Sequence, residues 1–267
     1  MRVDCRGITL LELIVSVSIF SLVGLMLAAA FSAATNTWRS TSASSDAQLA
    51  LNKARDDLVR DLQNTSFASV RVAGGATTLG PPDGDVVWFL SAIDPATGNY
   101  MRRSDGSPFW QRNILYYSIV PDNHSALFGY TCSGGADVDG YENQCPHKVL
   151  VRKVIDGGGA TDPNDETTEE TPLTASEASS YLTRPNGYDT SSMLAESGMT
   201  DVSLPSTNLL TFRVQLAPEP AWQREVRVEL GSVSILTAGR EVRIGSTPLS
   251  TTRFYRNLTL SVFPGLQ

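Results

Sequence analysis

The 267-residue chain has a formal net charge of −7, and 41% of its residues are apolar and 18% charged. This composition is typical of a folded protein rather than a disordered one, and its length beyond a membrane segment fits one ordinary domain or two very small ones. The sequence has no basic cluster, which argues against nucleic acid as the main partner because phosphate contacts need clustered lysine and arginine.

An uncharged apolar run extends from Leu13 to Ala34. A helix needs about 20 such residues to cross the hydrocarbon core of a membrane. The run is long for a secretory signal peptide, although the alanines at 28–30 and 33–34 keep a cleaved signal peptide open as an alternative. Arg2 and Arg6 precede the run, so the positive-inside rule places the N-terminus in the cytoplasm and the rest of the chain outside.

Glu12 lies at the start of this apolar segment, where a carboxylate is rare and usually has a partner. If the chain is cut after Gly7, Ile8 gains a positively charged amine and Glu12 becomes the fifth residue. The amine of a neighbouring copy could then pair with the Glu12 carboxylate, which would offset the burial of both charges and fix the register of adjacent helices.

The stretch Arg6-Gly7-Ile8-Thr9-Leu10-Leu11-Glu12, followed by the apolar run, resembles the N-terminal signature of type IV pilins and of the pseudopilins of type II secretion. The sequence departs from that signature in two places, with Ile8 where phenylalanine is commoner and Asp4 in the leader. The resemblance implies that a prepilin peptidase removes leader residues 1–7 by cutting between Gly7 and Ile8 and methylates the new amine of Ile8. An ordinary signal anchor or signal peptide is the alternative.

The helical pattern continues past the membrane edge. Apolar residues recur at spacings of three and four and form a stripe on one helix face, namely Ala47, Leu51, Ala54, Leu58 and Leu62. We predict one helix from Ile8 to about Gln63, roughly 80 Å long. Its half at 8–34 would lie in the membrane or the filament core, and its half at 35–64 would pack its stripe on a globular head.

Two further expectations concern the second half of this helix. Charged residues lie mainly off the apolar stripe, and Asp56 precedes Arg60 by four residues, the favourable order for an ion pair. The serine- and threonine-rich stretch from Thr35 to Ser45 is a weak helix former, so a break there is the alternative. Residues 36–66 also resemble minor-pilin-like proteins, on the basis of Trp38-Arg39 and the end of the helix.

Beyond Asn64 the pattern changes to alternation, which is typical of strands bounded by turn residues. The expected strands are Val86–Leu90, Ile114–Val120, Leu127–Thr131, Lys148–Val154, Leu209–Leu216, Val226–Leu236 and Phe254–Phe263. A bulge near Gly231-Ser232 would keep the apolar residues of its strand on one face. Residues 73–85 and 183–208 look loop-rich, and the acidic segment 156–180 is predicted to be a mobile surface loop.

The predicted fold class is therefore α+β. One long N-terminal helix, its first half transmembrane, packs on an antiparallel sheet in a β-rich periplasmic head at 65–267, with a second small sheet or hairpin region inserted. The resemblance implies the same lollipop arrangement, because larger minor pilins are built in this way.

Cys5 would leave with the leader, so Cys132 and Cys145 remain as an even pair in an exported head. An oxidising compartment favours a disulfide between them, and two free thiols are the alternative. We expect no zinc site, because two cysteines and histidines distant in sequence do not make a tetrahedral set.

Between these cysteines, Asp137, Asp139 and Glu142 are candidate calcium ligands, with Gly140 allowing a tight turn. Residues 162–166 form a second acidic candidate. Acidic turns are usually only solvated, and although some pseudopilins hold calcium, no matching motif can be carried over. We expect no other cofactor.

Enzymatic activity is not expected. The sequence has no nucleophile elbow, no phosphate-binding loop and no zinc-protease motif. Its two histidines, His124 and His147, lie in different predicted turns.

The sequence thus predicts a structural subunit, a minor pilin or pseudopilin of a type IV pilus or a type II secretion pseudopilus. It would lie in the inner membrane with its head in the periplasm before assembly. The expected partners are a prepilin peptidase, major and minor pilins or pseudopilins, an inner-membrane assembly platform and membrane lipid. The alternative is a signal-anchored periplasmic binding or hydrolytic protein, which needs neither Gly7 nor Glu12.

Overall fold

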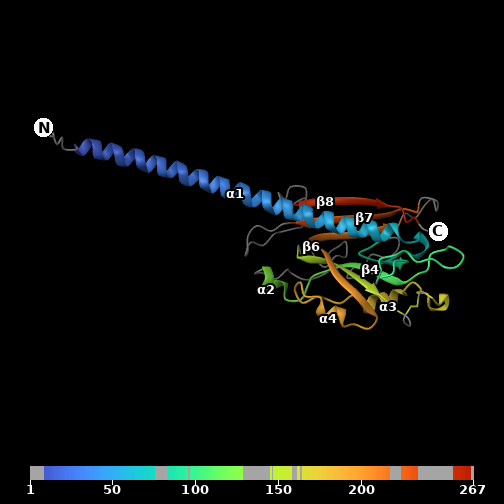
Figure 1. The fold of residues 1–267 in the computed structure, drawn as a ribbon. Coiled ribbons are helices and arrows are strands. Elements are labelled where there is room, and N and C mark those ends of the chain that lie inside the picture. The colour runs from blue at the N-terminus through green and yellow to red at the C-terminus, as the bar shows by residue number, and fades with distance from the viewer. Residues whose placement is uncertain are drawn as a thin grey trace, which may run out of the picture. The chain divides into compact units, whose positions relative to one another are not determined.

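The computed structural model describes residues 9–75, 83–95, 97–128, 145, 147–157, 161–162, 164–216, 224–233 and 255–265. The chain divides into two compact units, Met1–Ala43 and Ser44–Gln267. A long helix and an antiparallel sheet dominate the described residues, which confirms the α+β class (Figure 1).

Helix α1 runs without interruption from Leu10 to Gln63. The predicted single helix is confirmed, and the alternative of a break between Thr35 and Ser45 is wrong. Hydroxyl groups in this stretch donate to carbonyl oxygens four residues earlier, as Thr35 does to Phe31 at 2.7 Å and Thr37 to Ala33 at 2.9 Å. These bonds give the hydroxyl groups partners inside the helix, and the helix continues through them.

The strands form one antiparallel sheet in the order β1-β3-β4-β5-β6-β7-β8, with β2 paired to β6. Their bounds are β1 Arg71–Ala73, β2 Asp83–Gly84, β3 Val86–Ser91, β4 Arg112–Ile119, β5 Lys148–Ile155, β6 Met199–Leu216, β7 Val226–Val233 and β8 Tyr255–Val262. The predicted second sheet is not found among these strands, although two bridges, Ile93 with Tyr100 and Arg102 with Pro108, make a small hairpin region.

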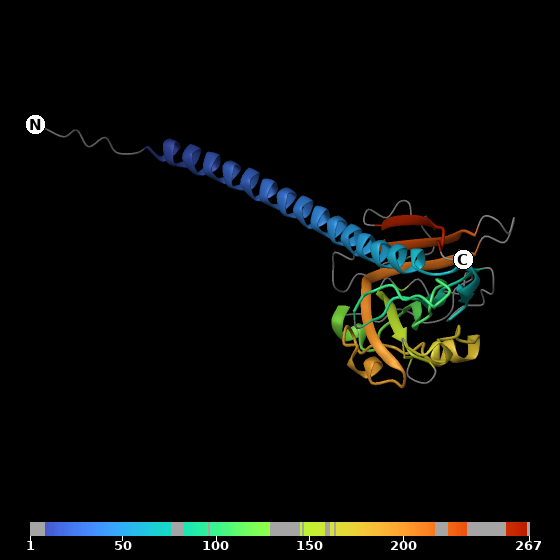
Figure 2. The ribbon, with the colours of Figure 1, turned by 45° about the vertical axis from the view of Figure 1, so that its right-hand side comes forward.

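The C-terminal part of α1 lies along one face of this sheet (Figures 1 and 2), and residues of its predicted apolar stripe belong to the core there. Leu58 and Leu62 are fully buried, as are Phe89 of β3 and Val228 of β7 in the same cluster. The second part of α1 is therefore held to the sheet by burial of apolar surface, the largest favourable term in folding.

The opposite face of the sheet is also covered, by the segment that follows β5. This segment contains the short helices η2 Glu166–Thr168, α3 Ala175–Ser180 and α4 Ser191–Leu194, and Figure 1 shows α3 and α4 across the sheet from α1. Leu173 and Met193 are buried against Trp88 and Leu115 of the sheet. The prediction of a surface loop at 156–180 is corrected here: its described part contains η2 and α3 and buries Leu173 against the sheet, because the central strands are apolar on both faces.

Lys153 of β5 holds this covering segment, which contains η2, α3 and α4, against the sheet. Its side chain is fully buried, and its Nζ donates to Glu196 Oε2 at 2.6 Å, to the Tyr181 carbonyl at 2.8 Å and to Thr183 Oγ1 at 2.8 Å. Burial lowers the pKa of Lys153, and the bonds with Glu196 oppose that shift. A buried ammonium with three partners fixes where the cover lies, since moving the cover would leave the charge without them.

The structure corrects the predicted strand at Leu127–Thr131. Residues His124–Phe128 form the short helix α2, and the rest of that prediction lies outside the described residues. Asn123 starts the turn with a φ of 58°, a conformation that asparagine tolerates, and its carbonyl accepts from Ala126 N at 2.9 Å. The local turn therefore overrides the apolar run that suggested a strand.

The long strand β6 begins ten residues before its predicted start, inside the segment expected to be loop. The register between Leu150 with Ser206 and Arg152 with Ser203 shifts there, so two residues of β6 oppose one of β5. Pro205 falls in this bulge, a position where its missing N–H breaks no ladder bond. The bulge expected near Gly231-Ser232 is present as a register shift between β6 and β7, but its extra residue, Leu210, belongs to β6 and not to β7.

Candidate functional site

Glu12 and Thr9 bond to each other at the start of α1. Thr9 donates to Glu12 Oε2 from its backbone N at 3.0 Å and from its Oγ1 at 3.1 Å, and Glu12 N donates to Thr9 Oγ1 at 3.3 Å. This reciprocal pattern is a capping box. Glu12 therefore also caps the start of α1. The sequence analysis missed this role, although the Thr-x-x-Glu spacing indicates a capping box. Gly7 and Ile8 lie outside the described residues, so cleavage and pairing with a neighbour stay predictions.

The first unit exposes its apolar side chains. Leu10–Trp38 is the one span among the described residues that is long and apolar enough to cross a membrane, and none of it is buried. All its large aliphatic and aromatic side chains up to Phe31 are exposed, for example Phe20 at 81%. Such a surface is far larger than a soluble monomer tolerates and needs lipid or other apolar helices around it.

In the head, a buried charged cluster ties the end of α1 to the sheet. Asp61 is 7% exposed, and its Oδ2 accepts from Arg152 Nε at 2.6 Å and from the Tyr116 hydroxyl at 2.7 Å. Burial lowers the pKa of Arg152, but Asp61, Tyr116 and Asp201 together outweigh it and raise the pKa above its usual value, so the guanidinium is held in its charged form. The predicted Asp56–Arg60 ion pair is not formed, because Arg60 pairs with Asp57 and Asp61, both at 3.0 Å.

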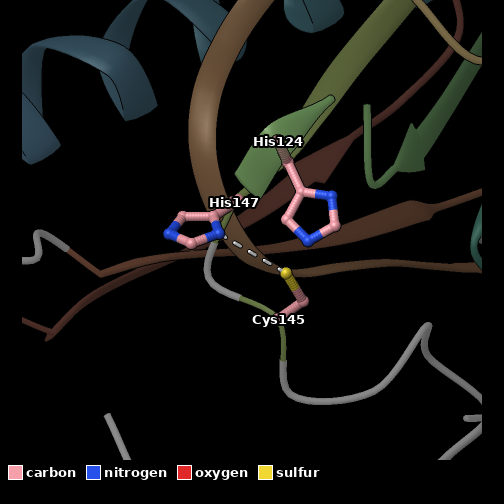
Figure 3. Close-up of side chains that lie close together, drawn as sticks. All are labelled: His124, Cys145 and His147. Carbon is pink, nitrogen blue, oxygen red and sulfur yellow. Dashed lines mark hydrogen bonds between the residues drawn. The ribbon is translucent and has the colours of Figure 1, made fainter. Parts of the chain in front are cut away.

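A second cluster contains His124, Cys145 and His147 (Figure 3). Their ligand atoms all lie within 4.8 Å of one another. Cys145 Sγ is 3.8 Å from His147 Nδ1, and the two imidazole rings are 5.9 Å apart. Cys145 and His147 are buried, and His124 is half-buried. Cys145 is disulfide-bonded in the structure, but its predicted partner Cys132 lies outside the described residues, so that pairing stays a prediction.

The sheet brings these three residues together. Strands β4 and β5 pair antiparallel, with Ile119 opposite Val149, so the residues after β4 lie beside those before β5. His124 follows β4, while Cys145 and His147 precede β5. The expectation that these histidines are too distant to join a metal-binding set is therefore wrong. The predicted neighbouring strands and the Cys-x-His spacing were the signals that could have found the cluster.

The cluster makes the stability of the head depend on pH. Burial, and then the charge of His124, lower the pKa of His147 to about 4, against about 6.5 in an unfolded chain. As the pH falls, His147 therefore takes up its proton in the unfolded state before it does so in the folded state. Its contribution to the free energy of unfolding is fully present above pH 6.5 and is lost as the pH drops toward 4, by up to about 3 kcal/mol. Urea unfolding of the full chain in detergent should show this loss, and His147→Gln should remove it. An equal pH dependence in the variant would contradict this origin.

The two predicted calcium sites have different outcomes. Asp137, Asp139 and Glu142 lie outside the described residues, so this site stays a prediction. In the second candidate, Asp162 accepts from Asn164 N at 2.9 Å and Asp165 from Thr167 N at 3.0 Å, while Glu166 accepts from Ser104 N at 2.7 Å. These carboxylates hold local turns and the adjoining hairpin, the role that acidic turn residues usually have.

Comparison with known proteins adds one family match. Residues 2–28 match the family described as the prokaryotic N-terminal methylation motif. This match and the apolar helix Leu10–Trp38, which overlaps it, show that the chain carries a prepilin signal of the kind found in type IV pilins and pseudopilins. Neither a curated protein nor a solved structure matches the chain.

Proposed function

We propose that this protein is a structural minor pilin or pseudopilin, a subunit of a type IV pilus or of a type II secretion pseudopilus. The observation that carries the proposal is the N-terminal methylation motif at residues 2–28, which includes the start of a continuous helix of 54 residues, Leu10–Gln63. A membrane anchor needs a span of about 20 residues, and it needs neither this processing signal nor a helix that continues into the head.

In the proposed mechanism, the chain first waits in the inner membrane with its head in the periplasm. A prepilin peptidase cuts between Gly7 and Ile8 and methylates the new amine. The exposed apolar surface of Leu10–Trp38 then moves from lipid into a filament core of similar helices. Both surroundings are apolar, so the move avoids the large cost of exposing this surface to water.

Glu12 would guide this move. In the cleaved chain, its carboxylate pairs with the Ile8 amine of a neighbouring copy or of another pilin. In an apolar core, the attraction between the two charges offsets the free-energy cost of burying each of them. Any register of adjacent helices that separates the two charges is therefore disfavoured. We further propose that the head is not an enzyme and that other pilins or pseudopilins and an inner-membrane assembly platform are its partners.

A second candidate, a signal-anchored periplasmic binding protein, has one observation in its favour. A pocket of about 560 Å³ lies beside the charged cluster at the end of α1, and Arg60, Arg112 and Arg152 line it together with Asp61 and Asp201. Its volume is within the usual range for small-molecule sites. Its arginines already pair with aspartates, however, which leaves less positive charge for an anionic ligand.

The two candidates differ in where the processed chain goes. The structural role predicts that the chain is found in sheared filaments as well as in the inner membrane, and that Gly7→Asp, which should block cleavage, leaves it in the membrane only. Quantitative immunoblotting of filament and membrane fractions measures this. A native chain that stays in the membrane fraction, while other pilins of the same cell are found in filaments, would contradict the structural role and favour the anchored binding protein.

A further inference from the structure

The cluster of His124, Cys145 and His147 has the donor set of a metal site. Imidazole nitrogen and cysteine sulfur are the ligands that zinc prefers in proteins. The three residues come from two segments that the pairing of β4 with β5 fixes side by side. A set held by sheet pairing does not depend on the chance arrangement of one flexible loop.

The distances in the cluster are close to those of a zinc centre. In a tetrahedral site with zinc bonds of about 2.0–2.3 Å, the ligand atoms lie about 3.3–3.6 Å apart. Cys145 Sγ and His147 Nδ1 are 3.8 Å apart, and the whole set lies within 4.8 Å. Movements of about an ångström would bring all three ligand atoms into the geometry of the bound ion.

Burial also suits such a site. Cys145 is 2% exposed and His147 1%, so two ligands are shielded from water, while half-buried His124 lies on the more open side. Imidazole binds a metal in its neutral form. The disulfide, however, keeps the Cys145 sulfur from forming a thiolate.

We propose that reduction of this disulfide opens a zinc site formed by Cys145, His124 and His147. Water fills the fourth position. The site therefore has two exclusive states: in oxidising surroundings Cys145 holds the disulfide, and in reducing surroundings it holds the metal.

The exchange balances without further reactants. One sulfur of a dithiol reductant attacks a sulfur of the protein disulfide, which breaks the protein S–S bond and releases one protein sulfur as a thiolate. The second sulfur of the reductant then displaces the other protein sulfur and forms the reductant's own disulfide. The dithiol is oxidised by two electrons, and its two protons end on the two protein thiols. The Cys145 thiol then releases its proton to solvent as its sulfur binds Zn²⁺, and the neutral imidazoles of His124 and His147 donate their lone pairs. Zinc keeps its oxidation state throughout.

The test uses zinc alone on the purified full chain in detergent, with metal content and affinity measured by equilibrium dialysis and titration. We expect the oxidised native chain to bind at least about 100-fold more weakly than the dithiol-reduced chain, which should take up one zinc per chain. Cobalt in place of zinc should give the charge-transfer absorption of a thiolate ligand. Equal zinc affinity in the oxidised and reduced chains would overturn the proposal.

Two cysteine variants form a matched pair. Cys132→Ser and Cys145→Ser both remove the predicted disulfide, but only the first keeps the Cys145 thiolate beside the histidines. Cys132→Ser should therefore bind zinc without reductant, and Cys145→Ser at least about 100-fold more weakly, since even residues that only orient metal ligands contribute 10–100-fold. Adding His124→Ala to Cys132→Ser should cause a similar loss. Circular dichroism checks that each variant is folded, and equal binding by the two folded cysteine variants would contradict the site.

Discussion

Glu12→Gln should lower incorporation of the chain into filaments by at least about tenfold while leaving cleavage after Gly7 unchanged. The variant keeps the size and hydrogen-bonding capacity of the side chain but removes its charge. The methylated amine of a neighbouring subunit then lies unpaired in an apolar core, which costs several kcal/mol, and each 1.4 kcal/mol is a factor of ten. The ratio of filament to membrane protein, measured by quantitative immunoblotting, gives the effect.

The capping box makes this result open to a second explanation, which Thr9→Ala separates. Glutamine can take the third helix position of a capping box as glutamate does. The Glu12→Gln variant can therefore still form both bonds of the cap, the one from Thr9 N to the side chain and the one from the backbone N of residue 12 to Thr9 Oγ1. Thr9→Ala removes the cap, typically worth about 1 kcal/mol, and keeps the charge. We expect incorporation of this variant to stay within about threefold of native. If Thr9→Ala is as defective as Glu12→Gln, the cap and not the charge is what assembly needs.

The second large effect is expected in the head. Arg152→Ala should lower the free energy of unfolding by about 3–5 kcal/mol, because it leaves the Asp61 carboxylate buried without its closest cationic partner. Urea unfolding of the full chain in detergent measures the change. Arg55→Ala is the matched control on the same helix, since Arg55 forms an exposed pair with Asp56, and exposed pairs contribute at most about 1 kcal/mol.

A double variant distinguishes a loss of charge pairing from a loss of packing. Asp61→Asn combined with Arg152→Met removes both charges and keeps most of the side-chain volume. It should recover a substantial part of the stability lost in Arg152→Ala, since it also removes the buried carboxylate that has lost its closest cation. If the double variant is less stable than Arg152→Ala, the pair contributes net stability and the penalty does not arise from the buried Asp61 charge.

The long helix could be predicted from the sequence because its physics is local. The uncharged run to Ala34 and the stripe from Ala47 to Leu62 each repeat with the period of a helix, and the structure buries that stripe. The strands with clear alternation or apolar runs, such as Val86–Leu90 and Lys148–Val154, were predicted to within one residue of their ends.

The features that the sequence analysis missed or predicted wrongly depend on residues far away in the sequence. Asp61 looks like any charged residue of a surface helix, and only the sheet supplies the Arg152 and Tyr116 that allow its burial. The segment 156–180 looks disordered by composition, yet it covers strands that are apolar on both faces. His124 meets Cys145 because the register of β4 with β5 places them side by side; the sequence analysis predicted both strands but did not pair them.

The mass of the mature N-terminus tests the central claim most directly. Mass spectrometry of the chain purified from its native membrane should find an N-terminal peptide that begins at Ile8 and carries one extra methyl group. A chain that retains its first seven residues, or one cut near Ala30, would contradict processing by a prepilin peptidase and with it the assembly role assigned to Glu12.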